Sequence, residues 1–143
     1  MVAPRKDLEG LKPPFRSAIQ WLIFLIEKEE LPLIVFETFR GGERQNSLKE
    51  SGSSKAGAAQ SPHNYGLACD FVLDVTKCPV REREWPEGSG QLYKDAWDYS
   101  TPEAKSAYDA FGKLAEGIGL EWGGRWKFLD VPHVQMPNWR RHI

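Results

Sequence analysis

The segment from Ser61 to Asp70, with the sequence SPHNYGLACD, places a histidine and an aspartate seven positions apart at the entry to an apolar strand. Gly66 lies between them and allows the chain to turn, so that a loop residue, His63, and a strand residue, Asp70, can converge. Imidazole and carboxylate groups are zinc ligands, and a catalytic zinc usually takes three protein ligands and keeps one position open for water. The segment therefore predicts two ligands of a metal site and requires a third elsewhere.

The third ligand is predicted in the segment Asp130-Val131-Pro132-His133, because the chain has only three histidines. On an unbroken strand, residues three apart would point to opposite faces. Pro132 cannot donate to a β-ladder and restrains Val131 to an extended conformation, so we expect the chain to bend here. Such a bend brings Asp130 and His133 into one cleft.

These residues predict a division of roles. His63, Asp70 and His133 would bind zinc, which lowers the pKa of a bound water toward ~7. Asp130 would take the proton of that water as general base and return it to a leaving amine; the alternative is that it only accepts hydrogen bonds in a turn. Arg40, at the end of an apolar strand, is the predicted positive partner of a developing oxyanion, and the alternative is an ordinary strand-end arginine.

Several elements must position these groups. Apolar residues at helical spacing, Ile19, Leu22, Ile23 and Ile26, predict a helix that Pro14 can open and that must stop before Pro32. The segment Leu33 to Thr38 reads as a buried strand. A short polar helix is expected from Glu43 to Glu50, and residues 53–60 are small and predict a loop.

The second half of the chain also alternates between predicted strands and helices. Period-two alternation from Ala68 to Val75 predicts a strand with one apolar face and one face that carries the carboxylates. A polar excursion, Lys77 to Tyr99, leads to a helix capped by Thr101 and ended by Gly117 or Gly119. Two strand-like pieces follow, at 125–129 and 133–136. The prediction is an α+β fold with helices on one face of a small, mostly antiparallel sheet.

Length and composition favour one domain over residues 1–143, with residues 1–13 as an N-terminal arm and without a separate wall-binding domain. With a net charge of -1, the protein has no strong positive electrostatic field that would attract nucleic acid. The apolar run Trp21 to Ile26 is shorter than the ~20 residues of a membrane span, and the charged residues after it do not suit a signal peptide. We therefore expect a protein made in the cytoplasm, without stable membrane insertion, and monomeric. Two cysteines, Cys69 and Cys78, fit a reduced chain.

The motifs also carry a family resemblance. The matching pieces are Phe39-Arg40, Glu43-Arg44-Gln45, SPHNYGLACD, Glu121 to Trp126 and Asp130 to Gln135. In this order and spacing they resemble the zinc peptidases of the D-alanyl-D-alanine carboxypeptidase and VanY type, whose fold is shared with hedgehog proteins. The resemblance is strongest to their phage endolysin branch, the L-alanyl-D-glutamate peptidases.

The resemblance implies zinc on His63, Asp70 and His133, Asp130 as the base, and Arg40 steadying the substrate carbonyl or the transition state. An aspartate at the base position is similar to the endolysin branch, whereas the carboxypeptidases more often have glutamate there.

The resemblance further implies that Ser61 helps to hold substrate, with plain turn chemistry before Pro62 as the alternative. Tyr65 and Trp126 are candidate substrate contacts, and packing around the site is the favoured alternative for both. Cys69 departs from the aliphatic residue expected beside the aspartate ligand; its thiol should point to the core.

The predicted function is a zinc-dependent peptidoglycan endopeptidase that cuts the L-alanyl-D-glutamate bond as a phage endolysin, acting on the cell wall after release by a partner such as a holin. One alternative is a D,D- or L,D-carboxypeptidase, for which Arg40, Arg44 or Arg125 could receive the terminal carboxylate. The other is a non-catalytic binding module that keeps the metal for structure. Asp130 argues against that module, because a structural zinc site needs no base.

Overall fold

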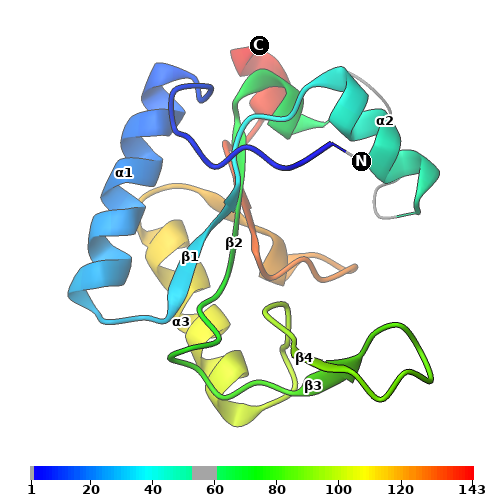
Figure 1. Cartoon of the computed structure of the whole chain (residues 1–143). Coiled ribbons are helices and arrows are strands. Elements are labelled where there is room, and N and C mark those ends of the chain that lie inside the picture. The colour runs from blue at the N-terminus through cyan, green and yellow to red at the C-terminus, as the bar shows by residue number, and fades with distance from the viewer. Residues whose placement is uncertain (1, 53–60) are drawn as a thin grey trace.

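The structure is a computed structural model that describes residues 2–52 and 61–143 (Figure 1). The predicted loop at 53–60 lies outside the described residues. The α-helices are α1 (Pro13–Lys28), α2 (Gly42–Glu50) and α3 (Pro102–Gly117). The strands are β1 (Leu33–Glu37), β2 (Ala68–Leu73), β3 (Glu82–Glu84), β4 (Leu92–Lys94), β5 (Glu121–Trp122) and β6 (His133–Gln135). Short 3-10 helices cover Pro62–Tyr65, Gly123–Arg125 and Trp139–His142.

The main sheet is antiparallel and has the strand order β1-β2-β6-β5. Its register aligns the candidate site across three strands, because Asp70 on β2 lies opposite Glu37 on β1 and opposite His133 on β6. The β1–β2 pairing shifts between Val35 and Glu37, which re-aims the end of β1. Residues from distant parts of the sequence thus meet at one end of the central strands.

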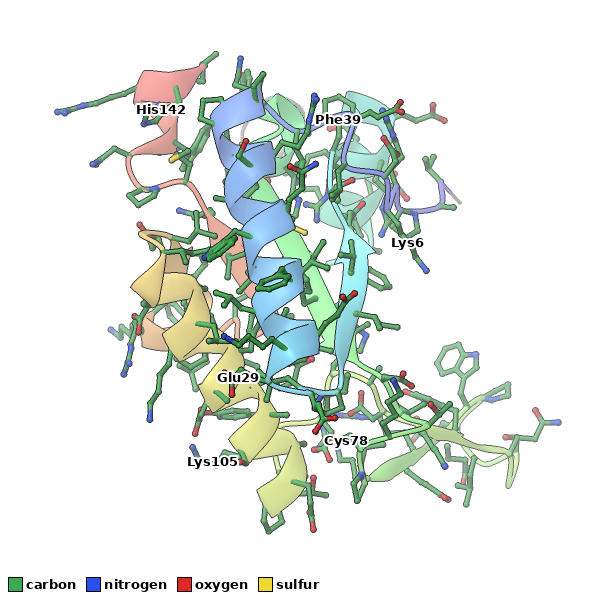
Figure 2. All side chains as sticks on the ribbon, turned by 90° about the vertical axis from the view of Figure 1, so that its left-hand side faces the viewer. Lys6, Glu29, Phe39, Cys78, Lys105 and His142 are labelled. Carbon is green, nitrogen blue, oxygen red and sulfur yellow. The ribbon has the colours of Figure 1, made fainter. Side chains whose placement is uncertain are left out.

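The two long helices cover one face of this sheet and lie side by side in front of it in Figure 2. The apolar face of α1, including Ile19, Leu22 and Ile26, is buried as its spacing predicts. Phe71 of β2 packs on Phe111 of α3 with ring centroids 5.0 Å apart. The α+β prediction is confirmed, while the short helix α2 lies on the other side of the sheet (Figure 1).

Element boundaries were predicted well where a cap marks them. Thr101 accepts a hydrogen bond from the Ala104 N–H at 3.1 Å and starts α3, which ends at Gly117. Helix α1 starts at Pro13, one residue earlier than predicted. The β2 side chains of Cys69, Phe71 and Leu73 face the core as expected.

One predicted element is wrong. The residues 125–129 do not form a strand, because the chain first makes a 3-10 turn at Gly123–Arg125 and then returns so that the Asp130 N–H donates to the Gly123 carbonyl at 3.0 Å. The strand of this region lies earlier, at Glu121–Trp122, where it pairs with β6.

The polar excursion from Lys77 to Tyr99 contains an antiparallel hairpin, β3–β4, which extends from the same side of the molecule as α2 (Figure 1). The N-terminal arm runs against the end of β1, where the Thr38 N–H donates to the Arg5 carbonyl at 2.7 Å. Cys69 and Cys78 are both buried, free thiols. Within residues 2–52 and 61–143, no helix combines the length and apolarity needed to cross a membrane.

Candidate metal centre

His63, Asp70 and His133 converge in the structure. Each offers one ligand atom, and the three atoms all lie within 4.8 Å of one another. His63 comes from the 3-10 helix before β2, Asp70 from β2 and His133 from β6. The two imidazole rings meet edge to face, with centroids 5.3 Å apart. The residues predicted as ligands therefore occupy one point in space, although His133 is 63 positions from Asp70.

Local sequence fixes the position of His63. Ser61 caps the 3-10 helix, since its hydroxyl accepts the His63 N–H at 3.3 Å and its own N–H donates to the Asn64 side chain at 3.1 Å. Gly66 ends the turn with φ 68°, and a Cβ there would lie 2.4 Å from the Gly10 carbonyl oxygen. Only glycine fits this left-handed, closely approached position. The motif SPHNYG thus specifies the turn that delivers His63 to β2.

The surroundings of His63 set its tautomer. Its Nδ1 lies 2.9 Å from the Thr38 carbonyl oxygen, which can only accept a hydrogen bond, so Nδ1 carries the proton. In the neutral ring, Nε2 then presents a lone pair to Asp70 Oδ2 at 3.3 Å. Nε2 is buried and has no hydrogen-bond partner among the described residues. Two electron-rich atoms that face each other in a buried site fit a cation between them.

His133 is oriented by a chain of side chains behind it. Gln135 donates through Nε2 to Glu121 Oε2 at 3.2 Å, so its Oε1 accepts the His133 Nε2–H at 2.7 Å. Trp126 Nε1 donates to the same Glu121 oxygen at 3.0 Å. The free nitrogen of the neutral His133 ring is then Nδ1, which lies 3.0 Å from Asp70 Oδ1. This outer hydrogen bond is the kind that fixes a metal-binding histidine in one tautomer.

The electrostatics of the group point the same way. Burial alone would raise the pKa of Asp70, but the charges and hydrogen bonds of His63 and His133 hold it far below its usual range. Burial alone would lower the pKa of His133, and the hydrogen bond and charge of Asp70 raise it instead. The carboxylate therefore stays ionised and attracts positive charge. The raised pKa of His133 shows that the group favours a positive charge, and a bound zinc ion would supply that charge in place of the proton. Two imidazole nitrogens and one carboxylate fit zinc in type, number and spacing.

Asp130 lies at the edge of this group, with its Oδ2 3.9 Å from His133 Nδ1 and 50% of its side-chain surface exposed. The cleft walls partly desolvate its carboxyl, which raises the pKa of Asp130 above its usual range; the charge of Asp70 adds to this, and the histidines oppose it. An accessible carboxylate with a raised pKa, beside a metal group, suits proton transfer.

The Trp122-Gly123-Gly124 segment holds the Asp130 loop. Trp122 Nε1 donates to the Val131 carbonyl at 2.8 Å. A Cβ on Gly123 would lie 2.3 Å from the Asp130 carbonyl oxygen, so the loop can approach only glycine this closely. The bend predicted around Pro132 is thus produced by contacts with the preceding turn.

Arg40 is buried beside the metal group, with Nη2 3.7 Å from Asp70 Oδ2. Nη2 also donates to Glu37 Oε1 and Nη1 donates to Gln45 Oε1, both at 2.8 Å. The other oxygen of Glu37 accepts from Arg44 Nε at 3.0 Å. Sequence reasoning missed Glu37 and Gln45; the signal that could have found Glu37 is a carboxylate inside the apolar run LIVFET.

A cleft of about 460 Å³ opens above the group. It is lined by Phe36, Glu37, Arg40, Arg44, Leu48, Ser61, His63, Asp70, Trp97, Asp130 and His133. Most of the predicted site residues therefore share one cavity, and Phe36 and Trp97, in edge-to-face contact at 4.7 Å, add an aromatic wall.

Two predicted substrate contacts lie elsewhere. Tyr65 stacks on Trp139 at 5.8 Å, and Trp126 packs against His133 with ring centroids 5.2 Å apart. Neither is among the described residues that line the cleft. Trp126 therefore packs against the metal group and Tyr65 against Trp139, while contact of either ring with substrate stays a prediction.

Comparison with known proteins places this site in a family. A family model described as D-alanyl-D-alanine carboxypeptidase matches residues 54–136, which include every residue of the metal group. The chain belongs to this family. Within the D-alanyl-D-alanine carboxypeptidase family it is similar to the peptidoglycan L-alanyl-D-glutamate endopeptidase CwlK of Bacillus subtilis (strain 168), with 32% identity over 117 residues. It is also similar to the L-alanyl-D-glutamate peptidase of Listeria phage A118, with 29% identity over 131 residues.

These matches cover 76% and 91% of this chain but only 63% and 38% of the two relatives, so the chain spans part of their length. Among solved structures, the Serratia marcescens L-Ala D-Glu endopeptidase ChiX superposes with a TM-score of 0.61 at 24% identity, covering 91% of this chain and 83% of that one. This likeness shows that the fold is that of the family.

Proposed function

We propose that the protein is a zinc-dependent peptidoglycan endopeptidase that hydrolyses the L-alanyl-D-glutamate bond of the stem peptide and serves as an endolysin. The observation that carries the proposal is the convergence of His63, Asp70 and His133 within 4.8 Å on the floor of a cleft that also holds Asp130. A structural zinc site is closed, whereas this one borders an open cavity with a base beside it. The names of the two relatives support the choice of bond.

In the proposed mechanism, His63 Nε2, an Asp70 carboxylate oxygen and His133 Nδ1 would hold a zinc ion. Bound zinc supplies a Lewis acid that makes a water nucleophilic near neutral pH. Asp130 accepts the proton of the attacking water, because its carboxyl is accessible and lies at the edge of the group. The protonated Asp130 then donates to the amine that leaves with D-glutamate, which resets the base.

Arg40 contributes positive charge beside the scissile carbonyl. Its guanidinium is fixed by Glu37 and Gln45, so it is in place before substrate arrives and needs no rearrangement when the oxyanion forms. Ser61 lines the cleft, and its hydroxyl keeps a proton to donate to substrate while it accepts the His63 N–H.

The carboxypeptidase alternative needs a cation that receives a terminal carboxylate. Arg125 does not suit this role, because it pairs with Glu116 through Nε and Nη2 at 3.0 Å and is not among the described cleft residues. Arg40 and Arg44 line the cleft but share the carboxylate of Glu37. We therefore favour an open-ended cleft and an endopeptidase. We further propose that the protein acts as a monomer and reaches the wall from the cytoplasm with the help of a holin; the phage relative supports this setting.

The test is mass analysis of purified peptidoglycan after digestion with the zinc-loaded protein. The proposal predicts fragments with a new amino-terminal D-glutamate and glycan strands that retain L-alanine. Release of terminal D-alanine, with the L-alanyl-D-glutamate bond intact, would establish the carboxypeptidase alternative. Zinc binding without any cleavage would establish the binding module.

A further inference from the structure

The β3–β4 hairpin exposes an unusual amount of apolar surface. Trp85 is 72% exposed, Leu92 63% and Tyr93 47%, and the strand residues of both β3 and β4 are exposed throughout. A two-stranded hairpin gains little stability by itself and usually hides large side chains against a core. Exposed apolar side chains gathered on one element mark an interaction site.

The register places the two rings on one face. Arg83 lies opposite Tyr93, and Trp85 follows Arg83 by two positions, so their side chains share a side of the hairpin. The Trp85 N–H donates to the Gln91 carbonyl at 2.9 Å, which extends this pairing by one bond. Trp85, Gln91, Leu92 and Tyr93 line a shallow cavity of about 450 Å³. The cavity therefore offers aromatic rings beside an amide.

A buried carboxylate joins this face rigidly to the catalytic cleft. Asp95 is 3% exposed; its Oδ2 accepts hydrogen bonds from Arg81 Nε and Arg83 Nε, both at 2.9 Å. Its Oδ1 accepts the Trp97 N–H at 3.0 Å. Trp97 contacts Phe36 and both line the cleft. The hairpin is thus connected through Asp95 to Trp97 of the aromatic cleft wall, and Tyr93 is at most about 14 Å of chain from Trp97.

The net charge of the hairpin limits the kinds of polymer that it could bind. Residues 81–94 contain three basic side chains (Arg81, Arg83, Lys94) and three acidic ones (Glu82, Glu84, Glu87), so the segment has no net charge. A polyanion would gain nothing from this surface. Aromatic rings bordered by hydrogen-bonding groups suit an uncharged polymer with both apolar faces and polar edges, which describes a chain of N-acetylated sugars.

The proposed substrate contains a chain of N-acetylated sugars close to the scissile bond. L-Alanine is the first residue of the stem peptide and joins the glycan strand through a lactyl group. A cut after this residue brings a sugar to within roughly 10 Å of the scissile bond, the span of two or three extended units. A glycan strand attached to the bound peptide would therefore lie within reach of the rim of the cleft.

We propose that the β3–β4 hairpin binds the glycan strand of peptidoglycan, with Trp85 and Tyr93 stacking on N-acetylated sugar rings while the attached peptide enters the cleft past Trp97. This inference rests on the proposed function for its choice of polymer. It assigns the hairpin a docking role that requires no contact with the reacting atoms.

The direct test is titration of the zinc-loaded protein with the tetramer of N-acetylglucosamine, followed by NMR of the tryptophan indole signals. The Trp85 signal should shift, and a Trp85→Ala/Tyr93→Ala variant should bind about tenfold more weakly, the effect of two modest aromatic contacts. A Trp21→Ala variant is the matched control, since Trp21 is 53% exposed on the distant helix α1. Unchanged hairpin signals at millimolar sugar, or binding only to phospholipid vesicles, would overturn the proposal.

Steady-state kinetics on substrates with and without glycan distinguish a role in binding the polymer from a role in the chemical step. On polymeric peptidoglycan the double variant should lose about tenfold in kcat/KM through a higher KM. On a soluble peptide that carries the same bond without glycan, it should match the unaltered protein. Equal losses on both substrates, or on neither, would contradict the docking role. If the unaltered protein cleaves neither substrate, the proposed function fails, and the sugar titration still decides the hairpin's role.

Discussion

The metal group and the β3–β4 hairpin differ in burial and in how their side chains are held. The side chains of His63 and His133 are buried, and each ring is oriented by a defined acceptor, Thr38 or Gln135. The hairpin exposes Trp85 and Tyr93, and Arg81 and Arg83 join it to the buried Asp95. The difference separates two tasks: a group that performs chemistry must be preorganised, whereas a surface that receives a polymer must stay accessible.

The largest effect is expected at Asp130. Asp130→Ala should reduce hydrolysis of a glycan-free peptide by about 10²–10⁴, because the general base is lost. Bound zinc, measured by elemental analysis, should remain unchanged, since Asp130 is outside the three-ligand group. Asp74→Ala is the matched control: Asp74 accepts hydrogen bonds from Thr76 beyond the end of β2 and should not affect the rate. Hydrolysis that survives Asp130→Ala would refute the assignment.

A smaller loss is expected when the tautomer of His133 is released. Gln135→Leu removes the acceptor of the His133 Nε2–H and should weaken zinc binding by about 10–100-fold. Competition with a chelator measures this directly. The same change on the hairpin, Gln91→Leu, should leave zinc affinity as it is. Equal affinities of both variants would show that the chain of side chains behind His133 does not position it.

Stability should respond at the turn that supports Asp130. Gly123→Ala places a Cβ 2.3 Å from the Asp130 carbonyl oxygen, and the overpacking should lower the free energy of unfolding by about 1–3 kcal/mol. Gly117→Ala meets nothing within 4 Å at the end of α3 and should be neutral or slightly stabilising. Urea denaturation compares the two. A neutral Gly123→Ala would mean that the loop moves freely away from the turn.

The smallest effect belongs to the hairpin. Trp85→Ala should change the free energy of unfolding by no more than about 0.5 kcal/mol, because the ring is mostly in solvent. The same denaturation experiment measures it. A loss of several kcal/mol would indicate that the hairpin is part of the core, and the contrast between the two regions would disappear.

The sequence predicted what local chemistry determines. Thr101 and Pro102 predict the start of α3, and the alternation of apolar and polar residues after Ala68 predicts β2 and its core face. The separation of His63 and Asp70 by Gly66 was enough to predict their convergence, because the turn between them is local.

Other features depend on contacts that exist only in the folded chain. The carboxylate inside LIVFET marks Glu37 as unusual but does not name its partners, since Glu37 meets Arg40 and Arg44 only after β1 is followed by α2. Gln135 gains its role only when β6 pairs with β5 and brings Glu121 beside it. Likewise, the residues 125–129 carry strand-like composition, but the turn at Gly123 deprives them of a pairing partner.

The proposed chemistry requires a metal ion held by side chains from three segments, so zinc content is the most direct measurement. The purified chain, dialysed against zinc and then buffer, should retain stoichiometric metal, and Asp70→Ala should lose it. Anomalous scattering should place the ion between His63 Nε2, Asp70 and His133 Nδ1. A protein that retains no zinc, or a variant lacking all three side chains that retains it in full, would contradict the account.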